Sequence, residues 1–94
     1  MTAVKKFLPI GSVVLLKESQ KRIMIVGVKQ KQEGADKVWD YSACLYPEGI
    51  LDPDRLYLFD TEQIERLYFI GFQDGEGLAF LGKLSQLDET QEQK

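Results

Sequence analysis

The sequence predicts an α+β domain that is mainly β: a small twisted antiparallel sheet or SH3-like barrel with a C-terminal helix. Two patterns predict it. Apolar residues occur in short, strand-length segments up to about residue 72, and from residue 76 leucine recurs at every third position, as on one face of a helix. A chain of 94 residues suffices for one domain with one core. We therefore expect a single domain, with a β-rich core over residues 1–75 and a helix with a polar tail over residues 76–94.

The first two strands, over residues 12–17 and 22–29, are expected to be covered on both faces. Four successive apolar residues fill the first strand, and the second carries apolar side chains at odd and even positions alike. By simple alternation, Val28 should face away from Ile23. Gly27 has no side chain to pack inside this strand, so it predicts a bulge or a bend.

The later elements are shorter. Asp60, followed three residues later by Gln63, forms a capping box that predicts a short helix over residues 61–66, with Ile64 and Leu67 on its inner side. Around it, alternating or apolar segments predict three more strands, over residues 37–46, 55–59 and 68–72.

The irregular segment between residues 46 and 59 is the predicted partner-binding site. Binding residues concentrate on loops carried by a rigid scaffold, and aromatic residues are frequent at the centres of interfaces. The competing interpretation is that the two tyrosines fold back over an open end of the sheet, and the C-terminal helix is the next candidate site. The candidate contact residues are Tyr46, Pro47, Glu48, Leu51 and Tyr57.

Charge and composition narrow the class of partner. The net charge is −3 and the sequence pI is about 4.9, which argues against nucleic acid, because nucleic-acid binding draws on a basic surface. The lysines and arginine between residues 17 and 31 are expected to form a solvated strand face.

No apolar run is long enough to cross a membrane, and a single cysteine excludes an internal disulfide. We expect a cytoplasmic protein with a protein partner.

Catalysis and cofactor binding have little support. The chain has no histidine, which removes the commonest general base and metal ligand. Cys44 lies inside a strand pattern and is expected to be buried and inert. Glu48 could pair with Asp52 or with Asp40 as two catalytic carboxylates, but nothing in the sequence distinguishes these pairs from other acidic residues. We therefore expect a non-enzymatic protein without metal or cofactor.

Several short motifs together resemble a bacterial family, the domain of unknown function 4176. The resemblance covers roughly residues 7 to 74, and its opening and its turn are specific in combination. Among the matching motifs are Leu8-Pro9-Ile10-Gly11, Met24-Ile25-Val26-Gly27, Tyr46-Pro47-Glu48-Gly49 and the closing Phe69 with Gly71-Phe72.

The resemblance implies an accessory role in protein secretion. Members of the family resemble companions of type VII secretion clusters in Gram-positive bacteria, encoded near LXG-type toxins. The implied function is an adaptor or targeting chaperone for such a secreted toxin or effector. An immunity protein that inhibits a cognate toxin is the alternative, and a small nucleic-acid-binding barrel is a third hypothesis. The resemblance attaches no catalytic residues, and the oligomeric state stays open.

Overall fold

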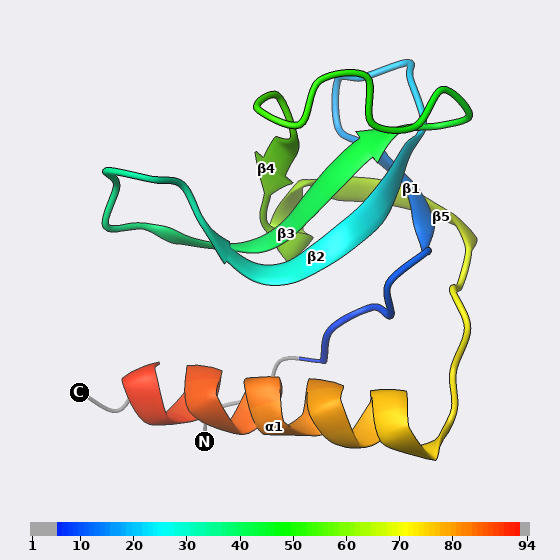
Figure 1. Ribbon diagram of the computed structural model, residues 1–94. Coiled ribbons are helices and arrows are strands. Elements are labelled where there is room, and N and C mark those ends of the chain that lie inside the picture. Colours follow the sequence, from blue (N-terminus) through cyan, green and yellow to red (C-terminus); the bar gives the residue numbers. More distant parts are fainter. Residues whose placement is uncertain (1–5, 93–94) are drawn as a thin grey trace.

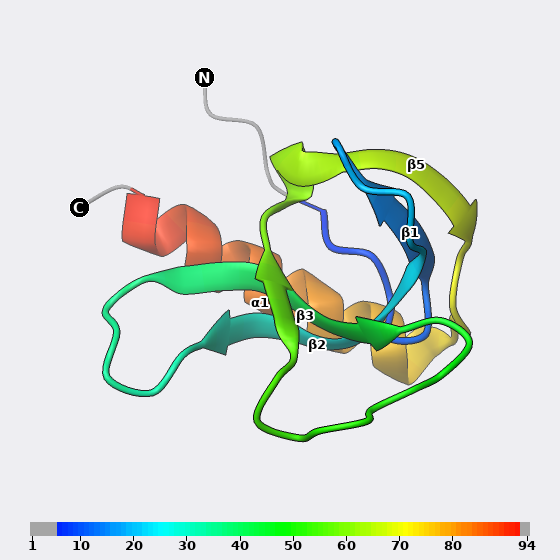
Figure 2. The ribbon, with the colours of Figure 1, turned by 90° about the horizontal axis from the view of Figure 1, so that it is seen from above.

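The structure, a computed structural model, describes residues 6–92. Within these residues, five strands form one antiparallel sheet, and one long helix lies below it (Figure 1). The order across the sheet is β4-β3-β2-β1-β5, so β4 and β5 form its two edges. The sheet curls strongly when seen from above (Figure 2) but does not close. The elements in chain order are β1 (Val13–Leu16), β2 (Ile23–Lys31), β3 (Val38–Leu45), β4 (Tyr57–Phe59), the 3-10 turn η1 (Thr61–Gln63), β5 (Ile64–Phe69) and α1 (Gly75–Glu92). The predicted α+β, mainly β fold is confirmed, with an open sheet rather than a closed barrel.

The hydrophobic core lies between the inner face of the sheet, the N-terminal segment and α1. Tyr41 is its centre. The Tyr41 ring packs edge-on against Phe7 with centroids 6.0 Å apart, and it packs in a tilted arrangement against Phe59 with centroids 5.3 Å apart. The Tyr41 hydroxyl accepts a hydrogen bond of 2.9 Å from the backbone N–H of Leu8. This bond ties the N-terminal segment to the sheet, since a buried phenol needs a polar partner.

The bulge predicted at Gly27 is present and reverses one predicted face. The pairing of β2 with β3 shifts register between Ile25 and Gly27. An inserted residue moves all later side chains to the opposite face. Val28 therefore stands opposite Tyr41 and packs against the core, on the same side as Ile23, and the prediction that it faces away was wrong.

The helix predicted over residues 61–66 is a single 3-10 turn, η1, over Thr61–Gln63. The capping box is confirmed: Asp60 and Gln63 bond each other's backbone, and the Asp60 N–H donates to Gln63 Oε1 at 2.9 Å. The helical turn ends at Gln63, however, whose carbonyl accepts a 2.8 Å bond from the Lys17 N–H. From Ile64 the chain forms strand β5, which pairs with β1. Without β5, one edge of β1 would have no hydrogen-bonding partner. Leu67, expected on the inner side of a helix, is exposed.

The C-terminal helix is confirmed, and it extends further than predicted. It runs through Glu92, although a polar tail was expected within residues 76–94. Only Leu81 and Leu84 of the leucine stripe pack on the core, while Leu78 and Leu87 are exposed. At three-residue spacing each leucine is rotated by about 60° relative to the one before, so the four cannot share one face.

Candidate functional site

The residues of the predicted site do not come together: Leu51 and Tyr57 line one hollow, and Tyr46 lines another. Leu51 and Tyr57 line a hollow of about 190 Å³ formed by residues 49–52 and 55–57 with the end of β3. Leu51 is 71% exposed and Tyr57 is 47% exposed, and Pro47 is exposed as well. Tyr46 does not line this hollow. Tyr46 is 39% exposed, so neither tyrosine is fully buried.

Glu48 is engaged with a lysine rather than exposed as a free charge. Its carboxylate lies 2.7 Å from the Lys21 ammonium nitrogen through Oε1 and accepts a hydrogen bond of 2.9 Å through Oε2. The hydrogen bond from Lys21 holds the pKa of Glu48 below its ordinary value of 4.5. This pair links the turn after β3 to the loop before β2.

A second hollow, of about 450 Å³, lies on the outer face of the sheet over β1. Val13 belongs to it, whereas the neighbouring Val14 points into the core, as strand alternation requires. We call it the outer hollow, and its lining residues are Gly11, Val13, Arg22, Met24, Tyr46, Tyr68 and Phe69. Arg22 stands between its two tyrosines, with the guanidinium carbon 5.4 Å from the Tyr46 ring centroid and 5.5 Å from that of Tyr68.

A third hollow, of about 340 Å³, lies between the start of α1, the N-terminal segment and the linker after β5. Several large apolar side chains stand exposed in and beside it, with Phe72 81% and Phe80 58% exposed. Exposed apolar patches of this kind mark interaction surfaces. We call this set the apolar rim: Ile10, Phe69, Ile70, Phe72, Leu78 and Phe80.

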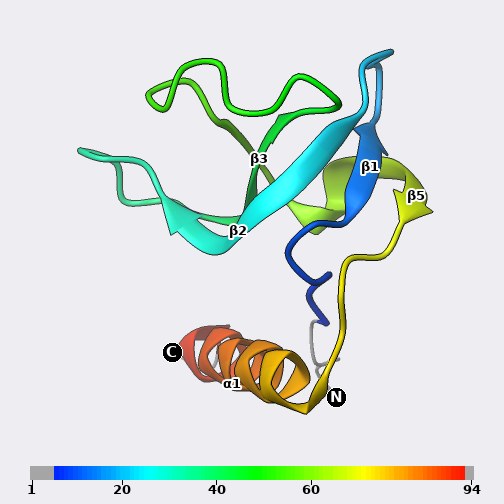
Figure 3. The same cartoon turned by 45° about the vertical axis from the view of Figure 1, so that its right-hand side comes forward.

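The segment before β1 and the linker after β5 are joined by hydrogen bonds, and this junction holds the rim in place. Figure 3 shows the N-terminal segment and the linker after β5 running side by side from the sheet to α1. The Ser12 hydroxyl accepts a 3.0 Å bond from the Gly71 N–H and donates a 2.7 Å bond to the Pro9 carbonyl. A Cβ at Gly71 would lie only 2.1 Å from the Ile10 carbonyl oxygen, so the position requires glycine.

Sequence patterns revealed only part of the rim. The C-terminal helix, which carries Leu78 and Phe80, was the next candidate site, whereas residues 68–72 were predicted as a last strand and not as part of a site. The available signal was that apolar residues occupy consecutive positions next to Gly71 at the end of the sheet. Whether they were covered depended on the path of α1, which the sequence does not give.

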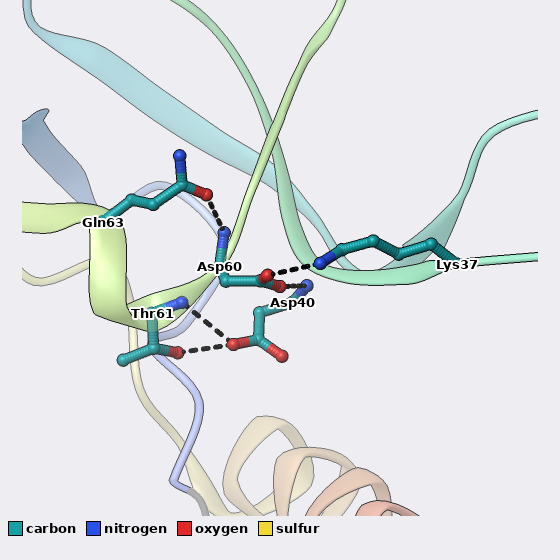
Figure 4. A network of polar contacts seen from close by, with 5 residues as sticks. All are labelled: Lys37, Asp40, Asp60, Thr61 and Gln63. Carbon is teal, nitrogen blue, oxygen red and sulfur yellow. Dashed lines mark hydrogen bonds and ion pairs between the residues drawn. The ribbon is translucent and has the colours of Figure 1, made fainter.

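A buried carboxylate, Asp40, joins the third strand to the 3-10 turn (Figure 4). Its Oδ2 accepts 2.9 Å hydrogen bonds from both the N–H and the hydroxyl of Thr61. Its own N–H donates to Asp60 Oδ1 at 3.1 Å, and Lys37 pairs with Asp60 at 3.0 Å. These bonds hold η1 against β3, a structural role.

The structure gives little support for other classes of site, such as a metal site. Among residues 6–87, whose side chains are described, no three side chains of the metal-binding types come together as a metal site would require. Cys44 is buried, as predicted, beside the hollow that contains Leu51. Within residues 6–92, no helix combines the length and apolar character needed to cross a membrane.

The chain matches a known protein family. A family model described as a domain of unknown function (DUF4176) matches residues 7–80, which is more than half of the chain. The match includes the junction of Ser12 with Gly71 and extends to Phe80 of the rim. Comparisons with curated proteins and with solved structures gave no match.

Proposed function

The chain belongs to the domain of unknown function 4176 family, and we propose that it is a non-enzymatic cytoplasmic adaptor or targeting chaperone. Its partner would be an LXG-type effector of a type VII secretion system. The family itself assigns no activity. The link to secretion comes from the resemblance of family members to companions of such effectors.

The observation that supports a binding role is the apolar rim. Six large apolar side chains stand exposed around the junction of β5, the N-terminal segment and α1. A protein that acted alone would gain stability by burying them, at about 25 cal/mol for each Å² of apolar surface. The rim side chains are carried on regular elements and on a junction fixed by Ser12 and Gly71, so a partner would meet a preformed surface.

The absence of histidine from the sequence supports the non-enzymatic part of the proposal. The buried carboxylate of Asp40 is bonded to Thr61 in a structural cluster. The lone cysteine, Cys44, is buried. These two groups, which could otherwise act as base or nucleophile, are thus used in the fold.

The test is the export of the effector encoded beside this gene. We expect deletion of the gene in its native cell to abolish secretion of that effector without arresting growth. Complementation with Phe72→Ser should fail to restore export, because Phe72 is 81% exposed and its loss affects the rim rather than the core. Val38→Thr, at an exposed apolar site on β3 outside the rim, is the matched control and should restore export fully.

Two results would overturn the proposal. Unchanged export in the deletion strain would exclude an adaptor role. Growth arrest with normal export would identify an immunity protein that protects the cell from its own toxin.

A further inference from the structure

We propose that the outer hollow and its arginines bind an acidic segment of a partner polypeptide, in which a carboxylate lies next to an apolar side chain. This inference deepens the proposed function, on which it rests for the existence of a partner, by naming the chemistry that the partner presents. The site is distinct from the apolar rim, although Phe69 belongs to both.

The first step is the cluster that two guanidinium groups form with two aromatic rings. Arg22 lies between Tyr46 and Tyr68, and Arg66 has its guanidinium carbon 5.5 Å from the Tyr68 ring centroid. We call these four residues the arginine–tyrosine ladder. They come from the loop before β2, the turn after β3 and strand β5, and all four side chains are exposed. The Tyr46 N–H also donates a 3.0 Å bond to the Arg22 carbonyl, which fixes the two residues relative to each other.

The second step is that the two guanidinium groups have no carboxylate partner among residues 6–87, whose side chains the structure describes. Three other cations of the chain do: Lys21 pairs with Glu48, Lys37 with Asp60, and Arg55 with Asp52. A cation–π contact to a ring does not consume the N–H donors of a guanidinium group. Arg22 and Arg66 therefore keep donors for a carboxylate, which a guanidinium group can bind in two-point geometry.

The third step is the apolar floor beside those donors. Val13, Met24 and Phe69 line the outer hollow together with Arg22 and the two tyrosines. Its volume of about 450 Å³ lies within the range of ligand pockets, roughly 300–1,000 Å³. Tyrosine, arginine and methionine are enriched at interfaces, and tyrosine and arginine dominate their energetics. A bound segment thus needs an apolar side chain for the hollow and a carboxylate for the arginines.

Charge favours an acidic peptide over a nucleic acid. The two arginines form a small cationic site on a chain of net charge −3. A nucleic acid carries a phosphate at every nucleotide and needs a row of cations. Here Glu48 lies two residues from Tyr46, and Lys21 beside it is already paired with that carboxylate.

The experiment uses the full chain and a labelled peptide of about ten residues in which Asp and Glu alternate with Leu and Phe. Its counterpart carries Asn and Gln at the acidic positions, and a labelled oligothymidylate is the nucleic-acid probe. We expect only the acidic peptide to bind, and binding to weaken as salt is raised. Arg22→Gln and Arg66→Gln should each weaken it about tenfold. Arg55→Gln, an exposed arginine already paired with Asp52, is the matched control and should leave binding unchanged.

A second measurement needs no variant. In the wild-type protein, the acidic peptide should shift the NMR signals of the Arg22 and Arg66 side-chain N–H groups and leave that of Arg55 in place. Equal binding of the neutral peptide, unchanged signals at both arginines, or full binding by both glutamine variants would overturn the inference. Binding of the oligothymidylate in place of the acidic peptide would reassign the ladder to nucleic acid and overturn it as well.

The outcomes separate this inference from the proposed function. If the acidic peptide binds at the ladder but deletion leaves effector export unchanged, the proposed function fails and the site stands. If export requires the protein but the acidic peptide does not bind at the ladder, the inference fails and the proposed function stands.

Discussion

The hydroxyl of Ser12 accepts a hydrogen bond of 3.0 Å from the backbone N–H of Gly71, across 59 positions of sequence. Ser12 follows the opening turn, in which Gly11 has a φ of 93° and donates its N–H to the Ile25 carbonyl. Gly71 follows β5. The bond therefore joins the start of the sheet to its last strand and gives a physical reason for two of the motifs on which the family resemblance rests.

Replacing Ser12 with alanine should destabilise the fold. Ser12 is fully buried, so the change leaves the Gly71 N–H without its partner and should lower the free energy of unfolding by about 1–3 kcal/mol. Urea unfolding measures this. The control is Ser19→Ala, where the hydroxyl makes only local bonds to Lys21, and its effect should stay within about 0.5 kcal/mol. Equal effects of the two substitutions would contradict the role given to Ser12.

A methyl group at Gly71 should also be costly. The added Cβ would lie 2.1 Å from the Ile10 carbonyl oxygen, which is backbone and cannot rotate away. We expect Gly71→Ala to lower the free energy of unfolding by about 3 kcal/mol. Gly82→Ala, where the Cβ meets nothing within 4 Å on α1, should instead raise it by about 1 kcal/mol. A neutral Gly71→Ala would show that the two segments can separate without loss.

Removal of the Asp40 carboxylate should release the 3-10 turn. Asp40→Ala leaves the N–H and hydroxyl of Thr61 without their acceptor, and we expect a loss of about 2–3 kcal/mol. Hydrogen exchange at the amide of Thr61 should accelerate accordingly. Asp54→Ala, at an exposed loop carboxylate, is the control and should change neither quantity. Unaltered exchange in Asp40→Ala would show that the turn is held by other contacts.

The Glu48 carboxyl should titrate below its ordinary pKa of 4.5, because Lys21 bonds to its charged form. A folded-state pKa below the unfolded one means that the group stabilises the protein above the unfolded value, and that this contribution disappears as pH falls through the folded value. Carboxyl NMR in wild type and in Lys21→Met measures the effect, and the variant should restore the pKa toward 4.5. If both proteins titrate alike, the ion pair does not persist in solution.

Cys44 should react slowly with thiol reagents while the protein is folded. Its side chain is buried, so reaction with a reagent requires local opening of the structure around the hollow that Cys44 lines. Labelling followed by mass spectrometry should show a rate that rises steeply in denaturant. Rapid labelling in buffer alone would point to a mobile loop and a redox-accessible thiol.

Local patterns in the sequence determined the elements and some of their details. Short apolar segments were sufficient for the mainly β fold, and Asp60 with Gln63 marked a helical turn through a capping box that spans four residues. The bulge at Gly27 was readable as well, because a glycine in the interior of a strand is typical of a bulge or a close backbone approach. Each of these signals acts over a few residues, so the order of amino acids along the chain contains it.

Only the tertiary structure decided which faces meet. The register shift at Gly27 turned Val28 inward. The pairing of β5 with β1 made Ile64–Phe69 a strand, although a helix was predicted up to residue 66 and a strand only from residue 68. In the same way, three-dimensional packing separated Tyr46 from Tyr57 and brought Arg22 between Tyr46 and Tyr68. Such contacts depend on how distant segments cross, and their energies appear only after the chain has closed long loops, so no local pattern encodes them.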